Sequence, residues 1–160
     1  MVQIERYNNE LLYEIKELNK KFYDNVDLEW YTSDLKDTFY FVCCRENKTL
    51  VGYAVIMGLT ENAYQSLIDD FVLVNDDEGD NEEIIYAVET PYYYLSSIVV
   101  AEDARRKGYG HQIMDLVMQQ RFPSLSAITV SKEGLTLLSR YMDIKSQLGD
   151  YCFVLEKKVE

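Results

Sequence analysis

The sequence predicts an α/β fold in which all 160 residues belong to one domain. Segments with the apolar, β-branched composition of strands alternate with segments in which apolar residues recur at helical spacing. Residues 92–118 join one such strand to one such helix through a basic turn that contains glycine. The hydrophobic fraction of 48% is sufficient for one core at this length, and neither a linker nor an internal repeat interrupts the pattern.

The first part of the chain is predicted to form two helices and then a hairpin. Asparagines suited to a helix N-cap precede the first helix. The two strands of the hairpin are rich in β-branched and aromatic residues and flank a polar turn. The predicted elements are a strand at 2–5, a helix capped by Asn8 or Asn9 that extends to Phe22, a shorter helix at about 26–35, and strands at 39–44 and 50–57.

The second part is predicted to alternate strands with helices after an irregular segment. Residues 95–100 are apolar apart from Ser96 and Ser97, as in a strand buried on both faces. Phe122-Pro123 ends the helix that follows. The predicted elements are a helix at 62–73, a charged loop at 75–83, a possible extra strand at 84–88, the central strand at 92–100, a helix at 110–121, a buried strand at 127–130, a helix at 134–142 and a last strand at 151–155.

The turn after the central strand has the composition of an anion-binding site. Arg105, Arg106 and Lys107 supply three positive charges, and Gly108 and Gly110 stand where the next helix begins. Glycine lets a ligand approach the backbone, and the unpaired N–H groups and the dipole of a helix N-terminus favour an anion. We therefore predict that this turn binds phosphate or pyrophosphate.

Two common phosphate-binding motifs are excluded. The turn lacks the Gly-Lys-Ser/Thr ending of a P-loop, and Ile113 stands where a dinucleotide fingerprint has glycine. What remains is Arg105-x-x-Gly108-x-Gly110 between a strand and a helix. This pattern resembles the acyl-CoA-binding motif of the GNAT superfamily of N-acetyltransferases. The predicted order of elements also resembles that of a GNAT domain over the whole chain.

The resemblance implies a mixed central sheet of about six to seven strands flanked by four helices. In such a sheet the strand ending at Val100 and the strand ending at Val130 run parallel and splay apart. It also implies acetyl-CoA as the co-substrate, with pantetheine in that gap, and no metal. Backbone groups of Ile98 and Val100 would pair with the pantetheine amides.

The same resemblance assigns the pyrophosphate to the basic turn. The alternative is that its cations only make the surface soluble, and that His111 is a solvent-facing residue that contributes its backbone alone. The implied contacts are the backbone N–H groups of Arg106, Gly108, Gly110 and His111 and the side chains of Arg105, Arg106 and Lys107, with Tyr109 in the same turn.

A catalytic acid is implied on the last helix. Many GNAT enzymes have a tyrosine there that protonates the leaving thiolate, preceded by an asparagine. Counting along the motif from Val130 gives Gly134 in place of the asparagine and Tyr141 at the tyrosine. Lys145-Ser146 replaces the Gly-Phe that usually follows. The alternative is that Tyr141 is a packed aromatic residue.

The general base is left open. Tyr94 stands where some GNAT enzymes have a glutamate. A water relay could serve, or another acid such as Glu61 or Glu89, although each of these can equally be a surface charge. Glu61, Glu89 and Tyr94 are therefore the candidates for substrate binding.

Charge and composition restrict the partners. The net charge of −12 argues against nucleic acid, and no apolar run is long enough to span a membrane. The acidic segment 75–83 can attract a cationic substrate or be a solvated loop. Cys43, Cys44 and Cys152 lack metal-ligand spacing and are interpreted as reduced thiols, which together with an N-terminus unlike a signal peptide indicates the cytoplasm.

Two functions remain open from the sequence. The first is an acetyl-CoA-dependent N-acetyltransferase that acts on a primary amine of a cationic small molecule or peptide. The second is a GNAT-fold domain that binds CoA as a sensor or interaction module without transferase activity. A homodimer is compatible with either.

Overall fold

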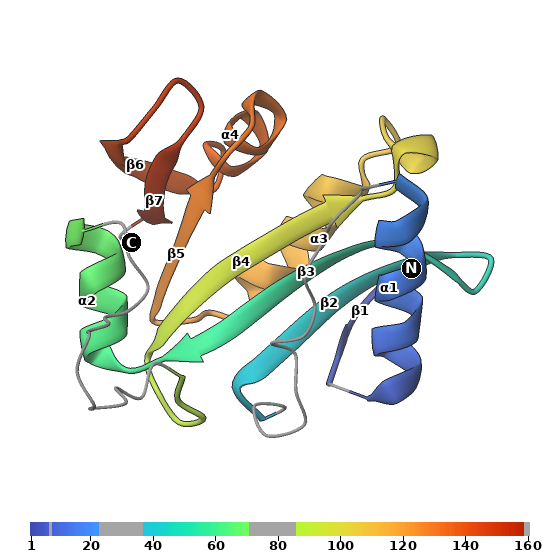
Figure 1. Ribbon diagram of the computed structural model, residues 1–160, viewed down its shortest axis with the longest axis horizontal. Coiled ribbons are helices and arrows are strands. Elements are labelled where there is room, and N and C mark those ends of the chain that lie inside the picture. The colour runs from blue at the N-terminus through green and yellow to red at the C-terminus, as the bar shows by residue number, and fades with distance from the viewer. Residues whose placement is uncertain (7, 23–36, 71–85, 159–160) are drawn as a thin grey trace. The chain divides into compact units, whose positions relative to one another are not determined.

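The computed structural model describes residues 1–6, 8–22, 37–70 and 86–158 (Figure 1). The described strands form one mixed sheet of seven strands in the order β1-β2-β3-β4-β5-β7-β6. Four α-helices accompany it in the described part of the chain, which confirms the predicted α/β class. The helix predicted at 26–35, the acidic loop at 75–83 and the first two residues of the strand predicted at 84–88 lie outside the described residues. Of the rest of that strand, Tyr86 forms only an isolated bridge with Leu59.

The chain divides into two compact units. The first comprises Met1–Ile56 and Ser97–Gln120, and the second comprises Met57–Ser96 and Arg121–Glu160. The elements of the first unit are β1 (Val2–Glu5), α1 (Asn9–Phe22), β2 (Phe39–Glu46), most of β3 (Thr49–Leu59), the end of β4 (Tyr92–Val100), the short 3-10 helix η2 (Glu102–Ala104) and α3 (Tyr109–Gln119).

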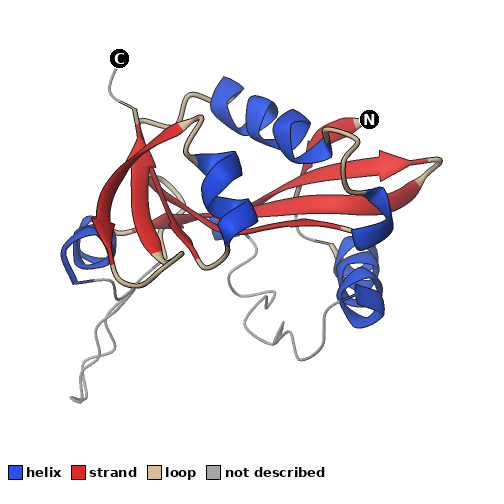
Figure 2. Cartoon of the chain, turned by 90° about the horizontal axis from the view of Figure 1, so that it is seen from above, coloured by secondary structure: helices blue, strands red, loops and turns tan. Residues whose placement is uncertain are grey.

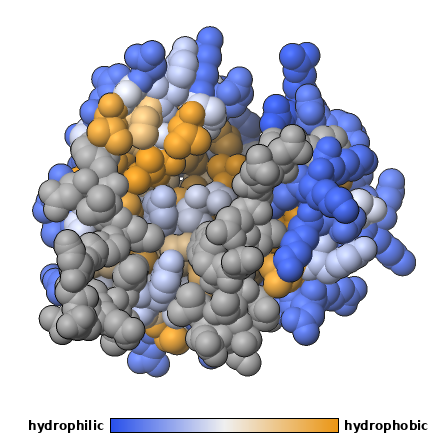
Figure 3. All heavy atoms as spheres, viewed as in Figure 1, coloured by the Kyte–Doolittle hydropathy of each residue, from blue (hydrophilic) through white to orange (hydrophobic). Residues whose placement is uncertain are grey.

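Helix α1 begins where the sequence predicts. The Asn8 side-chain oxygen accepts a hydrogen bond from the Leu11 backbone N–H at 2.8 Å, which satisfies one of the N–H groups that a helix start leaves unpaired. Leu11, Ile15 and Leu18 are buried at helical spacing. The opposite side of α1 carries charged residues, and the surface over this helix is largely hydrophilic (Figure 3).

Helices α1 and α3 lie on opposite faces of the strands of the first unit (Figures 1 and 2). Helix α3 buries Ile113, Met114 and Val117 and contacts β1 and β2. Gly52 on β3 makes this packing possible, because a Cβ atom there would lie 3.2 Å from the Val99 carbonyl oxygen and 3.3 Å from Ile113 Cδ1. A close-packed core thus holds the start of α3 against the end of β4.

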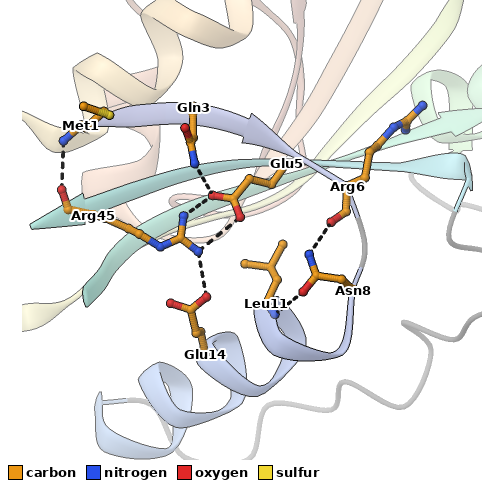
Figure 4. A network of polar contacts seen from close by, with 8 residues as sticks. All are labelled: Met1, Gln3, Glu5, Arg6, Asn8, Leu11, Glu14 and Arg45. Atoms are coloured by element: carbon orange, nitrogen blue, oxygen red, sulfur yellow. Dashed lines mark hydrogen bonds and ion pairs between the residues drawn. The ribbon is translucent and has the colours of Figure 1, made fainter. Parts of the chain in front are cut away.

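An ion-pair network joins β1, β2 and α1 (Figure 4). The Arg45 guanidinium donates to both oxygens of Glu5 and, at 2.7 Å, to Glu14 Oε1. All three side chains are at least three-quarters buried. Burial acts to raise the pKa of Glu5, but the hydrogen bonds from Arg45 and Gln3 and the charge of Arg45 together outweigh it, so the pKa is lowered. The network therefore stabilises the first unit where Glu5 is ionised.

We expect Arg45→Met to lower the free energy of unfolding by about 2–3 kcal/mol, less than for a fully buried pair. The two carboxylates would lose the charge that offsets their burial. Because Glu5 has a lowered pKa when folded, its contribution is present above its unfolded pKa of about 4.3 and is lost as the pH falls through the folded value. Urea unfolding at pH 7 and pH 3 measures this. A loss of equal size at both values would contradict it.

The second unit has its own strands and helices. These are the end of β3, α2 (Glu61–Asp70), the start of β4, β5 (Ser124–Thr129), α4 (Lys132–Leu138), β6 (Met142–Gln147) and β7 (Phe153–Lys157). Strands β6 and β7 pair antiparallel, and β7 pairs antiparallel with β5. Tyr93 on β4 packs against Phe122 with ring centroids 4.4 Å apart.

The prediction differs from the structure at several elements of this unit, and the last strand, predicted at 151–155, is β7 at Phe153–Lys157. Strand β5 runs from Ser124 to Thr129 and not over 127–130, because its first residues include serines that break the apolar run although Ser126 is fully buried. Val130 lies outside the strand and is 82% exposed. Helix α4 ends at Leu138, so Tyr141 lies beyond the helix and not on it. Strand β6 is missing from the prediction, because the buried Met142 continues the helical spacing although it begins a strand.

Strand β4 pairs with β5 in parallel over only part of its length. The register runs from Tyr92–Ser124 to Leu95–Ala127. Beyond these pairs β5 continues to Thr129, which its antiparallel partner β7 still accompanies. The parallel pairing thus ends before β5 does, as expected for strands that separate toward their carboxyl ends.

Candidate functional site

The basic turn of the first unit is built by the connection between β4 and α3. The Ala101 N–H donates to the Val51 carbonyl at 2.7 Å, which fixes the point where the chain leaves the sheet. After η2, Arg105 is extended and Arg106 has a left-handed φ of 69°. A left-handed arginine costs on the order of 1–2 kcal/mol, and such strain is typical of functional turns.

Gly108 caps α3 in a left-handed conformation with φ 79°. No side chain caps this helix start, and the Gln112 N–H makes the helical bond to the Gly108 carbonyl at 3.1 Å. A Cβ atom at Gly108 would meet no protein atom within 4 Å. The glycine thus exposes the N–H groups of the first helical turn to approach by an anion.

The three cations of the turn differ in their surroundings. All three side chains are exposed. Lys107 forms an ion pair with Glu46 at the end of β2, with Nζ 3.1 Å from Oε2. The Arg106 guanidinium has no ion pair or hydrogen bond within the described residues. Lys107 is therefore already compensated, and Arg106 supplies positive charge that an anion would meet.

Glu46 also accepts a hydrogen bond from the Tyr109 hydroxyl. The bonds from Tyr109 and then from Lys107 lower the pKa of the Glu46 carboxyl. The same bond from Tyr109 to the carboxylate raises the pKa of Tyr109 to about 12. The Glu46 carboxylate on β2 thus links Lys107, the last cation of the turn, to Tyr109, the first residue of α3.

The structure places all the predicted cofactor-binding residues in the first unit. Ile98 and Val100 are half-buried at the end of β4, and His111 is half-buried in the first turn of α3. Together with 105–110 they surround one chain reversal between a strand and a helix. The predicted group is therefore brought together locally.

The remaining predicted residues belong to the second unit. Tyr141 is half-buried in the turn after α4, and its N–H donates to the Leu138 carbonyl at 2.9 Å. Burial, followed by the nearby Tyr86 and Cys152, raises the pKa of Tyr94 to about 12. Glu61 and Glu89 have exposed side chains. Tyr94 is thus a neutral phenol, and the two glutamates lie on the surface.

A polar cluster in the second unit is missing from the sequence-based candidates. Tyr64 on α2 is buried, and its hydroxyl donates to Glu156 Oε2 on β7 at 2.5 Å. Ser126 on β5 stands opposite Glu156 in the register. The sequence places Glu156 in a charged C-terminal stretch, and only alternation along the last strand could have assigned it to the sheet.

A cavity of about 670 Å³ lies in the first unit between α1, the start of β3 and the residues after β4. Its lining combines apolar residues such as Leu18, Leu50 and Ala101 with charged residues of both signs, among them Glu17 and Lys48. Asp103 at its rim lies 3.9 Å from Lys21. The cavity adjoins the connection that leads into the basic turn.

In the described part of the chain, no group of three or more His, Cys, Asp or Glu side chains is placed to hold a metal ion. Among the helices that the structure describes, none is long and apolar enough to cross a membrane.

Comparison with known proteins adds a family and several related folds. The model of the acetyltransferase (GNAT) family matches residues 7–130. No curated protein sequence matches. Naa50 from Arabidopsis thaliana, solved with the bisubstrate analogue CoA-Ac-MVNAL, is 13% identical with a TM-score of 0.62, covering 99% of both chains.

Two more solved structures share the fold. NAA60 from Arabidopsis thaliana, solved with acetyl-CoA, is 13% identical with a TM-score of 0.60 and covers 99% of this chain and 100% of its own. A ribosomal-protein alanine N-acetyltransferase from Escherichia coli is 10% identical with a TM-score of 0.60, covering 98% of this chain and 91% of its own. At these identities the likeness concerns the fold.

Proposed function

Because the chain belongs to the acetyltransferase (GNAT) family, we propose that it is an N-acetyltransferase that transfers an acetyl group from acetyl-CoA to a primary amine. The acceptor we propose is a cationic small molecule or peptide. The observation that carries the proposal is the turn from Arg105 to Gly110, with a left-handed glycine at an uncapped helix start.

Acetyl-CoA fits this turn by charge and by shape. The pyrophosphate would take the N–H groups at the start of α3, where Gly108 leaves open space. Arg105 and Arg106 would add charge-assisted hydrogen bonds, which are about twice as strong as neutral ones. Two of the related folds were solved with acetyl-CoA or a CoA conjugate, which supports the same co-substrate here.

Acetyl transfer to an amine makes three chemical demands. The amine must be neutral to attack the thioester carbon, the thioester oxygen needs a donor as it becomes negative, and the departing thiolate needs a proton. We assign the proton to the Tyr141 hydroxyl. The amine proton would pass to water, because Tyr94 is a neutral phenol and no acid is assigned as the base.

A peptide amine is one acceptor that the comparisons support. The analogue bound to Naa50 joins CoA to a peptide, and the Escherichia coli relative is named for an alanine of a ribosomal protein. A small cationic amine is the other, and a panel of acceptors separates them.

Calorimetric titration with acetyl-CoA, followed by measurement of CoA release against peptides and small amines, tests the proposal. We expect micromolar binding and release with at least one amine. Binding without release on any amine would favour the sensor function instead. If the protein does not bind acetyl-CoA, both the acetyltransferase and the sensor function are wrong.

Arg105→Glu should weaken acetyl-CoA binding about 10–100-fold, because it replaces a charge-assisted donor by a repelling carboxylate. Calorimetry measures the dissociation constant. Lys16→Glu on α1 makes the same charge change at an exposed position and is the matched control. An equal effect of both variants would show that net charge, and not this turn, governs binding.

A further inference from the structure

Three polar residues stand in one row across the sheet of the second unit. Tyr94 on β4 is in register with Ser126 on β5, and Ser126 is in register with Glu156 on β7. Directly paired residues of neighbouring strands point to the same face of a sheet. The row therefore presents a phenol, a hydroxyl and a carboxylate side by side.

Helix α2 supplies a fourth group to this row. The Tyr64 ring lies against Tyr92 with centroids 5.1 Å apart, and its hydroxyl donates to Glu156 Oε2 at 2.5 Å. Burial, then the hydrogen bond and charge of Glu156, raise the pKa of the Tyr64 phenol, so Tyr64 acts as a neutral donor. One oxygen of Glu156 is thus fixed in place from above the sheet.

The other polar atoms of the row are only partly satisfied. Ser126 is fully buried, and its Oγ makes no hydrogen bond of normal geometry, although it lies close enough to the Tyr64 hydroxyl to act on the pKa of that phenol. Glu156 Oε1 lies 3.9 Å from Lys145 Nζ, beyond hydrogen-bond distance, and the Glu156 side chain is 30% exposed. A buried hydroxyl without a hydrogen bond of normal geometry beside a half-satisfied carboxylate is costly unless a ligand or water completes it.

The charge of this cluster indicates which kind of ligand would satisfy its free hydrogen-bonding atoms. Glu156 is an acceptor. Its hydrogen-bond donor Tyr64 and its neighbour Ser126 on β5 are neutral, and Asp143 on β6, in register with Glu156 on the other side, adds a second carboxylate. An ammonium group could donate to Glu156 Oε1 and to Ser126 Oγ at once. Lys145 already brings one ammonium group to the edge of the cluster, and its side chain is 41% exposed and so can move aside.

We propose that Glu156 binds a second positive charge on the acceptor, so that the preferred substrates are amines carrying a separate cationic group, such as diamines. Ser126 completes the binding site, and Tyr64 positions the carboxylate. This inference rests on the proposed acetyltransferase function and specifies its acceptor.

The test compares a diamine with the monoamine of the same carbon chain, using 1,4-diaminobutane and butylamine. We expect Glu156→Gln to lower kcat/KM for the diamine about tenfold or more, equivalent to about 1.4 kcal/mol, and to change the monoamine less than twofold. Glutamine keeps an acceptor for Tyr64, so the fold should persist, which urea unfolding checks. Equal losses for both amines, or none for either, would overturn the proposal.

The variant Lys145→Ala tests whether Glu156 binds a ligand or only pairs with Lys145 inside the protein. If the ammonium of Lys145 competes with the ligand, its removal should tighten diamine binding severalfold. A purely structural pair predicts weaker binding or no change. The control for Glu156→Gln is Glu133→Gln on α4, which makes the same substitution at an exposed glutamate.

Calorimetric titration with the diamine distinguishes the proposed acetyltransferase function from the proposed cation site at Glu156. Diamine binding that Glu156→Gln abolishes, without CoA release, would support this site and refute the transferase function. CoA release with identical diamine binding by wild type and Glu156→Gln would support the transferase and refute this site.

Discussion

Tyr141→Phe is expected to lower the turnover number about 10²–10⁴-fold while leaving the dissociation constant for acetyl-CoA unchanged. The variant removes a single hydroxyl. If that hydroxyl gives the thiolate its proton, the barrier of the transfer step rises and binding of the co-substrate does not change. The effect should therefore fall on kcat.

The position of Tyr141 makes the variant informative. The residue follows the last turn of α4, half-buried, and the N–H of its backbone bonds to Leu138. Phenylalanine keeps the ring and this backbone bond, so the local fold should persist. Loss of activity with an unchanged urea midpoint would then report chemistry.

Single-turnover measurement of CoA release tests this most directly, because it isolates the transfer step from product release. Tyr13→Phe, which removes a hydroxyl from an exposed tyrosine of α1, is the control. A turnover number within twofold of wild type for Tyr141→Phe would show that another donor, or water, protonates the thiolate.

The basic turn could be predicted because its chemistry is written in consecutive residues. Cations, Gly108 and a helix start follow one another along the chain, and the left-handed φ of 79° at Gly108 is a conformation that favours glycine. That the turn binds an anion stays a prediction. The central strand was predicted with its observed bounds, Tyr92–Val100, for the same reason, since its apolar run is local.

Features that depend on distant residues could not be predicted. Tyr64 and Glu156 are 92 residues apart, and no local pattern joins them. Met142 is buried at helical spacing from Leu138, so periodicity extends α4 too far, although the chain leaves the helix at Ser139 and begins β6. Glu46 is likewise distant in sequence: it lies on β2 and accepts hydrogen bonds from Lys107 in the turn and from Tyr109 on α3.

Gly108→Val should weaken acetyl-CoA binding about 10–100-fold or more, because two effects combine. A β-branched residue strongly disfavours φ of 79°, so the helix start would have to move. If it does not move, the new side chain occupies the open space through which an anion reaches the N–H groups. Each charge-assisted hydrogen bond lost costs about 1.5–3 kcal/mol.

The strain and the blocked approach can be separated by the choice of variant. Gly108→Ala adds only a Cβ atom, which meets no protein atom within 4 Å, so its strain of roughly 1–2 kcal/mol should appear in urea unfolding. Gly149→Ala has no positive φ and a nearest contact of 3.7 Å, and serves as control. Since a phosphate group must come close to the backbone at Gly108, the loss of affinity should grow from alanine to valine faster than the loss of stability. If the two losses grow in parallel, the variant acts through folding, and the helix start does not contact the co-substrate.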